Sequence, residues 1–351
     1  MVQETIQPHV IEANPHPDRY ARGWHCLGLA SDYTRTPQTL EYFGGKQVAY
    51  RGADDKVHVL DGYCPHMGAN LGDGCVEGNG IRCPFHFWRW GPDGVCDDIP
   101  YAKRIPPKAV IKHWPTVEQN QLLFVWNDEE GRPPIEEQAI PRIDDAFSDE
   151  WSGYHMTKMT VYSHPRELMD NMADVAHFTY VHSRGVGGAS EFSNVAEGHR
   201  YTQFMRSDQS IPGMGNFSRA TYQGPSIMET HMYLYPNGKP DVRTNEQRLL
   251  VTHTPIDNTK FDLRFGVLIK KDPSMTEGQS QMWVESQVQA SQGAFDQDVK
   301  IWNNKIQVDN PILCDGDGPV GMLRRWFQNF YVDIDKLPDD YREKKVESVD
   351  L

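Results

Sequence analysis

The chain has 351 residues, a formal net charge of −14 at pH 7 and 38% hydrophobic residues. This length suffices for about two domains with packed cores, and the negative charge disfavours nucleic acid, whose phosphates attract Lys and Arg. No apolar run reaches the ~18 residues of a membrane span, and the first residues lack the basic and apolar stretches of a secretory signal.

The first third of the chain reads as short strands and turns with few helical patterns. Residues 46–50 and 56–60 flank a Gly-Ala-Asp-Asp turn signal and predict a hairpin. Residues 121–126 form a further apolar strand, and residues 128–134, rich in acid, Gly and Pro, read as a turn and linker. We therefore expect a small all-β domain over residues 20–135.

Two short motifs within this domain carry its chemistry. Cys64-Pro65-His66 is followed by Cys83-Pro84-Phe85-His86, that is, C-x-H and then C-x-x-H. Two thiolates on one iron and two imidazoles on the other are the ligands of a Rieske [2Fe–2S] centre. The alternative is a Cys2His2 zinc site, but zinc fingers pair Cys with Cys and His with His along the chain. The alternation favours the Rieske cluster.

The neighbours of these ligands refine the prediction. Respiratory Rieske proteins have an extra cysteine in each loop and a Gly-Ser after the second histidine. Here those places hold Ala69, Phe85, Phe87 and Trp88. Fewer hydrogen bonds to the sulfurs predict a potential towards the low end of the Rieske range, which resembles the oxygenase branch. The other cysteines show no disulfide pattern, and we expect a reducing cytoplasm; they are Cys26, Cys75, Cys96 and Cys314.

We expect residues 140–351 to form a second domain and residues 1–19 to pack against it. A helix begins at Pro165, capped by Ser163 or His164. Its apolar positions recur at helical spacing: Leu168, Met169, Met172, Ala173 and Ala176. A long helix is expected over about 280–308, after strands at roughly 199–207, 227–235, 245–254 and 259–270. Strands gathered together and then a long helix indicate an α+β domain with an antiparallel sheet.

A second metal site is predicted on and just after the helix that begins at Pro165. His177 and His182 are five positions apart, so the helix must bend or end between them for both rings to converge. Two histidines and a carboxylate, with open positions for O2, form the facial triad of non-haem Fe(II) oxygenases. We expect the carboxylate from the long helix, with Asp298 as the first choice and Asp296 as the second. Histidines near an acid are also common as plain surface or core residues.

Both motifs together resemble the oxygenase (alpha) component of Rieske non-haem iron oxygenases. The pattern N-x-x-D-x-x-H-x4-H is present at Asn171, Asp174, His177 and His182, and the stretch that begins Arg22-Gly23-Trp24 resembles the opening of the family. The resemblance implies a helix-grip (START-like) second domain with a long C-terminal helix. It also implies a homotrimer in which Asp174 bridges the iron-bound His177 and His86 of a neighbouring subunit. Asn171 has either a place near the iron or a structural role in the helix.

A narrower likeness concerns the tail. Residues 297–305, 309–311, 317–319 and 324–331 are similar to those of 3-ketosteroid 9-alpha-hydroxylase oxygenases. This likeness implies a steroid or another bulky apolar substrate, although sterol, terpenoid and aromatic-acid oxygenases remain alternatives. The candidate pocket-lining residues are Met205, Phe217, Met228, Met232 and Phe295, which could equally be core.

We therefore predict the terminal oxygenase of a multicomponent monooxygenase. Electrons would come from NAD(P)H through a flavin and iron–sulfur reductase, directly or by way of a ferredoxin, because no Gly-rich dinucleotide loop is present in this chain. The [2Fe–2S] cluster, mononuclear Fe(II) and O2 would serve the reaction. A dioxygenase or desaturase would use the same metals, whereas a Rieske electron carrier would lack the mononuclear iron.

Overall fold

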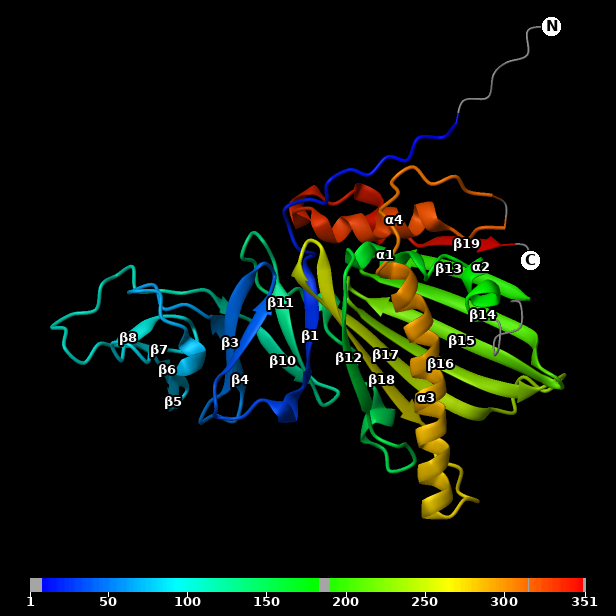
Figure 1. Cartoon of the computed structure of the whole chain (residues 1–351), viewed down its shortest axis with the longest axis horizontal. Coiled ribbons are helices and arrows are strands. Elements are labelled where there is room, and N and C mark those ends of the chain that lie inside the picture. The colour runs from blue at the N-terminus through cyan, green and yellow to red at the C-terminus, as the bar shows by residue number, and fades with distance from the viewer. Residues whose placement is uncertain (1–7, 183–189, 315, 350–351) are drawn as a thin grey trace, which may run out of the picture.

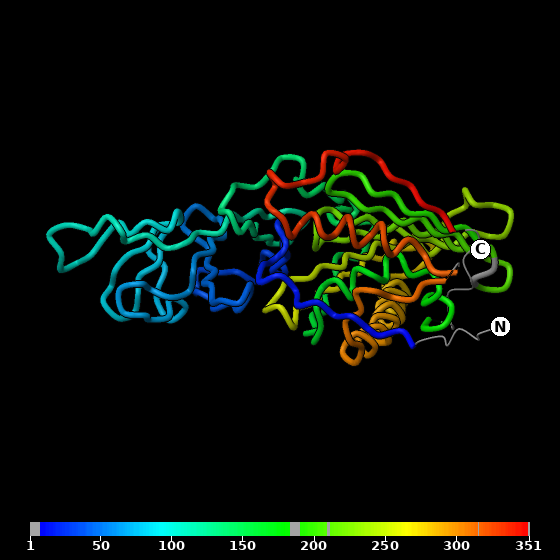
Figure 2. The backbone as a smooth tube through the Cα atoms, turned by 90° about the horizontal axis from the view of Figure 1, so that it is seen from above, coloured from blue at the N-terminus to red at the C-terminus, as the bar shows by residue number. Residues whose placement is uncertain are grey.

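The computed structural model describes residues 8–182, 190–314 and 316–349. The molecule is elongated, with residues 23–127 at one end and residues 155–349 at the other (Figures 1 and 2). In the described ranges, no helix has both the length and the apolar character needed to cross a membrane.

The N-terminal part consists of three antiparallel sheets with the orders β1-β11-β10, β2-β3-β4-β9 and β5-β6-β7-β8. The predicted hairpin is confirmed, because β3 and β4 pair with Tyr50 opposite His58. The strands are β1 (Gly23–Leu29), β2 (Gln38–Tyr42), β3 (Gly45–Arg51), β4 (Val57–Asp61), β5 (Cys75–Glu77), β6 (Gly80–Arg82), β7 (Arg89–Trp90), β8 (Cys96–Asp98), β9 (His113–Trp114), β10 (Thr116–Gln119) and β11 (Leu122–Asn127).

The C-terminal part is built on one eight-stranded antiparallel sheet of order β12-β18-β17-β16-β15-β14-β13-β19. The helix α3 (Glu277–Trp302) lies across one face of this sheet (Figure 1), which is the helix-grip arrangement. The strands are β12 (His155–Val161), β13 (Glu191–Glu197), β14 (Arg200–Ile211), β15 (Met214–Gln223), β16 (Ile227–Pro236), β17 (Thr244–Asp257), β18 (Lys260–Ile269) and β19 (Lys345–Val349).

Shorter helices surround the sheet. The α-helices are α1 (Pro165–Asp170), α2 (Ala176–Tyr180) and α4 (Val320–Gln328). Short 3₁₀ turns are η1 (Ala30–Asp32), η2 (Leu71–Asp73), η3 (Glu136–Gln138), η4 (Asp144–Phe147), η5 (Asn329–Tyr331), η6 (Ile334–Lys336) and η7 (Asp339–Arg342).

The predicted start of the first helix is confirmed, but its extent was wrong. Pro165 opens α1, and the His164 side chain accepts a hydrogen bond from the Arg166 N–H. The helix ends at Asp170, and a second helix, α2, runs from Ala176 to Tyr180. The predicted helix end between His177 and His182 is confirmed, because α2 stops before His182, but a further break precedes His177. The reason is tertiary: the Met172 carbonyl accepts a hydrogen bond from Gln203 Nε2 at 2.7 Å and is thereby drawn towards the sheet.

The other predicted elements differ mainly at their ends. The long helix was expected over about 280–308, but α3 starts earlier at a Thr276–Gln279 capping box and ends at Trp302. The four predicted strands correspond to β14, β16, β17 and β18, whereas β12, β13, β15 and β19 went unrecognised. The mixed α+β class with an antiparallel sheet is confirmed.

The two parts share a tightly bonded junction. Ser226 Oγ donates to the Trp24 carbonyl at 2.6 Å, and Thr254 Oγ1 donates to the Cys26 carbonyl at 2.6 Å. Ile227 and Leu250 of the large sheet join a buried cluster with residues of β1 and β11. The N-terminal segment follows the C-terminal part instead, since the Glu12 N–H donates to Asn310 Oδ1 at 2.9 Å.

Candidate metal centres and the cavity beside them

The two cysteine–histidine loops repeat one backbone pattern. The Cys64 N–H donates to the Ala69 carbonyl and the Cys83 N–H to the Trp88 carbonyl, both at 2.9 Å. The Cys64 and Cys83 carbonyls accept bonds from Gly68 and Phe87 respectively, four positions on. Gly68 and Phe87 both have left-handed backbone conformations, with φ of 75° and 61°. This conformation favours glycine, yet the second loop has Phe87 there. Each loop thus turns its cysteine and histidine towards a common point.

The side chains at this point fit a cluster. His66 Nδ1 and His86 Nδ1 are buried and have no hydrogen-bond partner in the described part of the chain. The two rings are 4.6 Å apart, and both cysteines are free and buried. Burial, with a smaller contribution from the adjacent Cys83 thiol, raises the pKa of Cys64 to about 11. An unpaired buried imidazole nitrogen is costly unless a metal takes its lone pair, and a metal centre at this point would also replace the protons of the two thiols.

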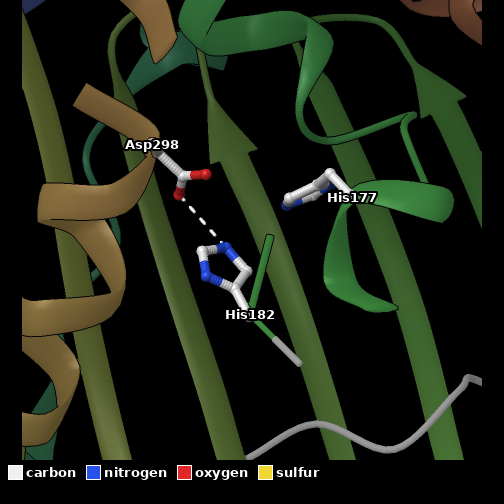
Figure 3. Close-up of side chains that lie close together, drawn as sticks. All are labelled: His177, His182 and Asp298. Carbon is white, nitrogen blue, oxygen red and sulfur yellow. Dashed lines mark ion pairs between the residues drawn. The ribbon is translucent and has the colours of Figure 1, made fainter. Parts of the chain in front are cut away.

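A second group lies between α2 and α3. The ligating atoms of His177, His182 and Asp298 all lie within 4.8 Å of one another. His182 Nε2 is 3.3 Å from Asp298 Oδ2, and His177 faces the same space from the start of α2 (Figure 3). Asp298 is buried, whereas Asp296 is exposed on another side of α3. Of the two candidate carboxylates, the structure therefore brings Asp298 to the histidines.

Hydrogen bonds orient both imidazoles. His177 Nδ1 lies 2.5 Å from the Asp174 carbonyl oxygen, and His182 Nδ1 lies 3.1 Å from Gln297 Oε1. Each ring can donate from Nδ1 and present a neutral Nε2 to a metal, the usual arrangement of metal-bound histidines. Gln297 was missed in the sequence, where a residue next to a predicted ligand has no signature of its own.

The pKa values of the two histidines respond to the same surroundings. Burial lowers the pKa of His177, which favours the neutral ring that binds metal. Burial also acts to lower the pKa of His182, but the hydrogen bond and charge of Asp298 outweigh it and raise the pKa. The group is thus a desolvated site with one acid, suited to a divalent cation.

Asn171 and Asp174 lie in the turn between α1 and α2. Asn171 Oδ1 accepts a hydrogen bond from Trp302 Nε1 at 3.4 Å and faces the space beside the triad. Asp174 Oδ1 accepts one from the His177 N–H at 3.1 Å, while its side chain remains 43% exposed. Asp174 therefore supports the His177 backbone and keeps part of its carboxylate open to solvent.

A cavity of about 600 Å³ adjoins the triad between the large sheet and α3. Of the predicted lining residues, Met205, Met228, Met232 and Phe295 line it, but Phe217 does not. Phe217 points to the opposite face of β15, where it packs against Tyr233 with ring centroids 5.1 Å apart. Successive strand residues alternate between faces. The polar residues Gln203, Asn216 and Gln247 also line the cavity. Because β15 was not predicted as a strand, the sequence analysis did not show which of its residues face the cavity.

Comparisons with known proteins agree with this geometry. Residues 23–115 match the Rieske [2Fe-2S] domain, and residues 125–331 match the family described as "3-Ketosteroid 9alpha-hydroxylase C-terminal domain". The crystal structure of dicamba monooxygenase bound to dicamba has the same fold, with a TM-score of 0.72 at 18% identity over 89% of this chain and 98% of that chain. A Rieske domain joined to a helix-grip domain that holds this triad defines the oxygenase component of a Rieske oxygenase.

Similar proteins show which family of Rieske oxygenases the chain belongs to. The 3-ketosteroid-9-alpha-monooxygenase oxygenase component of Rhodococcus rhodochrous is 40% identical over 353 residues, which cover 97% of this chain and 89% of the relative. The protein of that name from Mycobacterium tuberculosis is 39% identical over 95% of this chain and 88% of its own length. The chain belongs to the 3-ketosteroid 9α-hydroxylase oxygenase family. It is a terminal oxygenase that uses a [2Fe–2S] cluster, mononuclear iron and O2, and a separate reductase serves it.

Proposed function

We propose that this chain hydroxylates a 3-ketosteroid, or a closely similar bulky apolar compound, at an unactivated C–H bond. The observation that carries the proposal is the group of a buried Asp298 with the partly buried His177 and His182, beside a cavity of about 600 Å³ walled by methionines and Phe295. This volume falls within the ~300–1,000 Å³ of typical small-molecule sites. The names and high identity of the relatives favour the steroid class.

In this proposal Cys64, His66, Cys83 and His86 hold the cluster, and His177, His182 and Asp298 hold the iron. Bound there, the metals would pass electrons from the reductase to O2; the reaction consumes O2, two electrons and two protons, and gives the hydroxylated product and water. The protein residues do the rest. Asp174 and Gln297 orient the imidazoles, and the sheet and α3 surround the substrate and exclude water.

We further propose a head-to-tail homotrimer. The loops beside β5–β8 lie at one end of the molecule and α2 lies at the other, so the two metal sites of one chain are far apart (Figure 1). The inward Nδ1 of His86 leaves its other ring nitrogen facing outward, and the exposed part of Asp174 can accept a bond from it across a subunit interface. The reductase would draw on NAD(P)H, and the free cysteines suit the cytoplasm.

A single turnover tests the proposed reaction without the reductase. The metal-loaded protein is reduced with dithionite, mixed with androst-4-ene-3,17-dione and exposed to ¹⁸O2. We expect a hydroxylated steroid with one ¹⁸O atom. Two ¹⁸O atoms in the product would indicate a dioxygenase, and an unsaturated product without ¹⁸O a desaturase. If the protein holds only cluster iron and forms no product, it is a carrier and the proposal is wrong.

A further inference from the structure

The cavity beside the triad changes character along its length. On β15 its lining residues are Asn216, Ser218, Ala220 and Tyr222, every second residue of the strand. Because a strand rises about 3.4 Å per residue, these side chains span roughly 20 Å. The end at Asn216 and Ser218 is polar, whereas the end at Ala220 and Tyr222 is small and aromatic.

The position of α3 shows which end is remote from the triad. Gln287 Oε1 accepts hydrogen bonds from Asn245 Nδ2 and Gln247 Nε2, both at 3.1 Å. Asn216 lies in the neighbouring row of the sheet, because it pairs with Leu234, which in turn pairs with Thr244. From Gln287 to Asp298 the helix advances about 16 Å, at ~1.5 Å per residue. The polar end is therefore the end away from the proposed iron ligands.

Asn216 differs from the other amides at this end. The Gln247 and Gln287 side chains are bonded to each other, and Gln247 also bonds Asn245. Asn216 is only 3% exposed, yet its Oδ1 has no hydrogen-bond partner among the residues that the structure describes. A buried acceptor without a partner costs about 1–3 kcal/mol. Such an oxygen on a cavity wall is suited to a hydrogen-bond donor of the ligand.

We propose that Asn216 is a specificity-determining residue that accepts a hydrogen bond from a hydroxyl group of the substrate at the end remote from the carbon that is oxidised. Asn216 Oδ1 is an acceptor, so it can bond a hydroxyl, which has a proton to donate, but not a ketone oxygen, which only accepts. In a 3-ketosteroid such a hydroxyl lies at C17 or on the side chain that C17 carries. The inference rests on the proposed steroid hydroxylation and adds the substrate feature that the cavity recognises.

The test compares three probes with the metal-loaded protein: 17β-hydroxyandrost-4-en-3-one, androst-4-ene-3,17-dione with a ketone at C17, and androst-4-en-3-one without the 17-oxygen. Dissociation constants are measured by equilibrium dialysis for wild type, Asn216→Leu and Asn194→Leu. Asn194 is a matched control, because it is a fully buried amide with no partner for either amide atom in the described ranges and does not line the cavity. Asn216→Ala gives a second variant that adds no bulk.

We expect wild type and Asn194→Leu to prefer the 17-hydroxy probe over both the dione and the 17-deoxy probe by about five- to tenfold, the value of one neutral hydrogen bond. Asn216→Leu and Asn216→Ala should bind the 17-hydroxy and 17-deoxy probes equally. If both Asn216 variants keep the wild-type preference, or wild type shows none, the subsite is wrong while steroid binding stands. If wild type binds none of the probes, the steroid assignment fails and the subsite with it.

Discussion

Asp296 and Asp298 are two positions apart on α3 and have different surroundings. Residues at i and i+2 point to different sides of a helix, so Asp296 is exposed while Asp298 is buried beside His182. Burying a carboxylate costs desolvation energy, and this cost is offset when the carboxylate shares a cation with two partly buried imidazoles. The structure thus distinguishes Asp296, an exposed acid, from Asp298, the proposed metal ligand.

Asp298→Ala should remove about one Fe per chain, because a two-histidine site binds Fe(II) far more weakly than the complete facial triad. The visible spectrum of the cluster should not change, since its proposed ligands lie in the other domain. Iron is measured by plasma emission and the cluster by absorbance. Asp296→Ala is the control and should retain full iron. An iron loss in Asp296→Ala and not in Asp298→Ala would show that the wrong carboxylate was chosen.

At the scale of elements, the segment with both histidines depends on the C-terminal tail. None of the residues of α2 is fully buried, so packing of its own side chains does little to hold it. The turn before it contacts the segment that leads into α4: a Cβ on Gly318 would lie 1.6 Å from the Ala173 carbonyl oxygen. Arg324 adds a two-pronged ion pair to Asp170 at 2.6 and 3.0 Å. The tail therefore positions the turn that precedes His177.

Gly318→Ala should lower the free energy of unfolding by about 2 kcal/mol, because the added methyl group meets backbone that cannot rotate away. It should also lower the iron content of the second site, since Ala173 is next to Asp174. Thermal unfolding and iron analysis check both effects. Gly316→Ala is the matched control, as its added Cβ would have Cys314 Sγ at 3.9 Å as its nearest neighbour. Equal stability of the two variants would contradict the role given to this contact.

At the scale of the molecule, buried histidines occupy the junction of the two parts. The ring of His25 in β1 lies between two carbonyl oxygens, with Nε2 3.0 Å from that of Ala21 and Nδ1 3.4 Å from that of His253, and the single N–H of a neutral ring donates to one of them. Burial lowers the pKa of His25 to about 4 and that of His164 to about 2. Burial, with the charges of His25 and His164, lowers the pKa of His253 well below its usual value. The junction is thus built for neutral rings.

Acidification should therefore destabilise the protein. The unfolded chain takes up these protons below its ordinary histidine pKa of about 6.5, while the folded chain does not. Stability is complete above this pH and falls as the pH drops towards 4, by up to about 4 kcal/mol per pH unit for three histidines. Melting temperatures between pH 7.5 and 5 measure the slope. His253→Leu should reduce it by about a third, and the exposed His113→Leu should not; equal slopes in both would overturn this account.

The proposed trimer makes a separate prediction for Asp174. Asp174→Asn keeps the size of the side chain and removes its charge, so the trimer, the cluster spectrum and most of the iron should persist. Reoxidation of the reduced protein by O2 with substrate should slow about 10- to 100-fold, because the variant weakens the proposed bond between the Asp174 carboxylate and the cluster histidine His86 of a neighbouring subunit. Stopped-flow absorbance follows the rate, and light scattering follows the trimer. Unchanged rates at unchanged iron content would leave Asp174 as an ordinary surface acid.

The sequence by itself determined the features that depend on near neighbours in the chain. The spacing of Cys64, His66, Cys83 and His86 indicated the cluster because each pair lies on one tight loop. The start of α1 at Pro165 was likewise predictable, since proline and a polar cap act within one turn. Strand periodicity and the long helix sufficed for the α+β class.

Only the tertiary structure decided what depends on contacts between distant segments. The choice of Asp298 over Asp296 follows from the packing of α3 against a histidine that is 116 positions away. The break before α2 follows from the bond of the Met172 carbonyl to Gln203 and from the approach of Gly318. Phe217 points away from the cavity and Asn216 lines it because of the register of β15. This register could not be predicted, since β15 was not recognised as a strand.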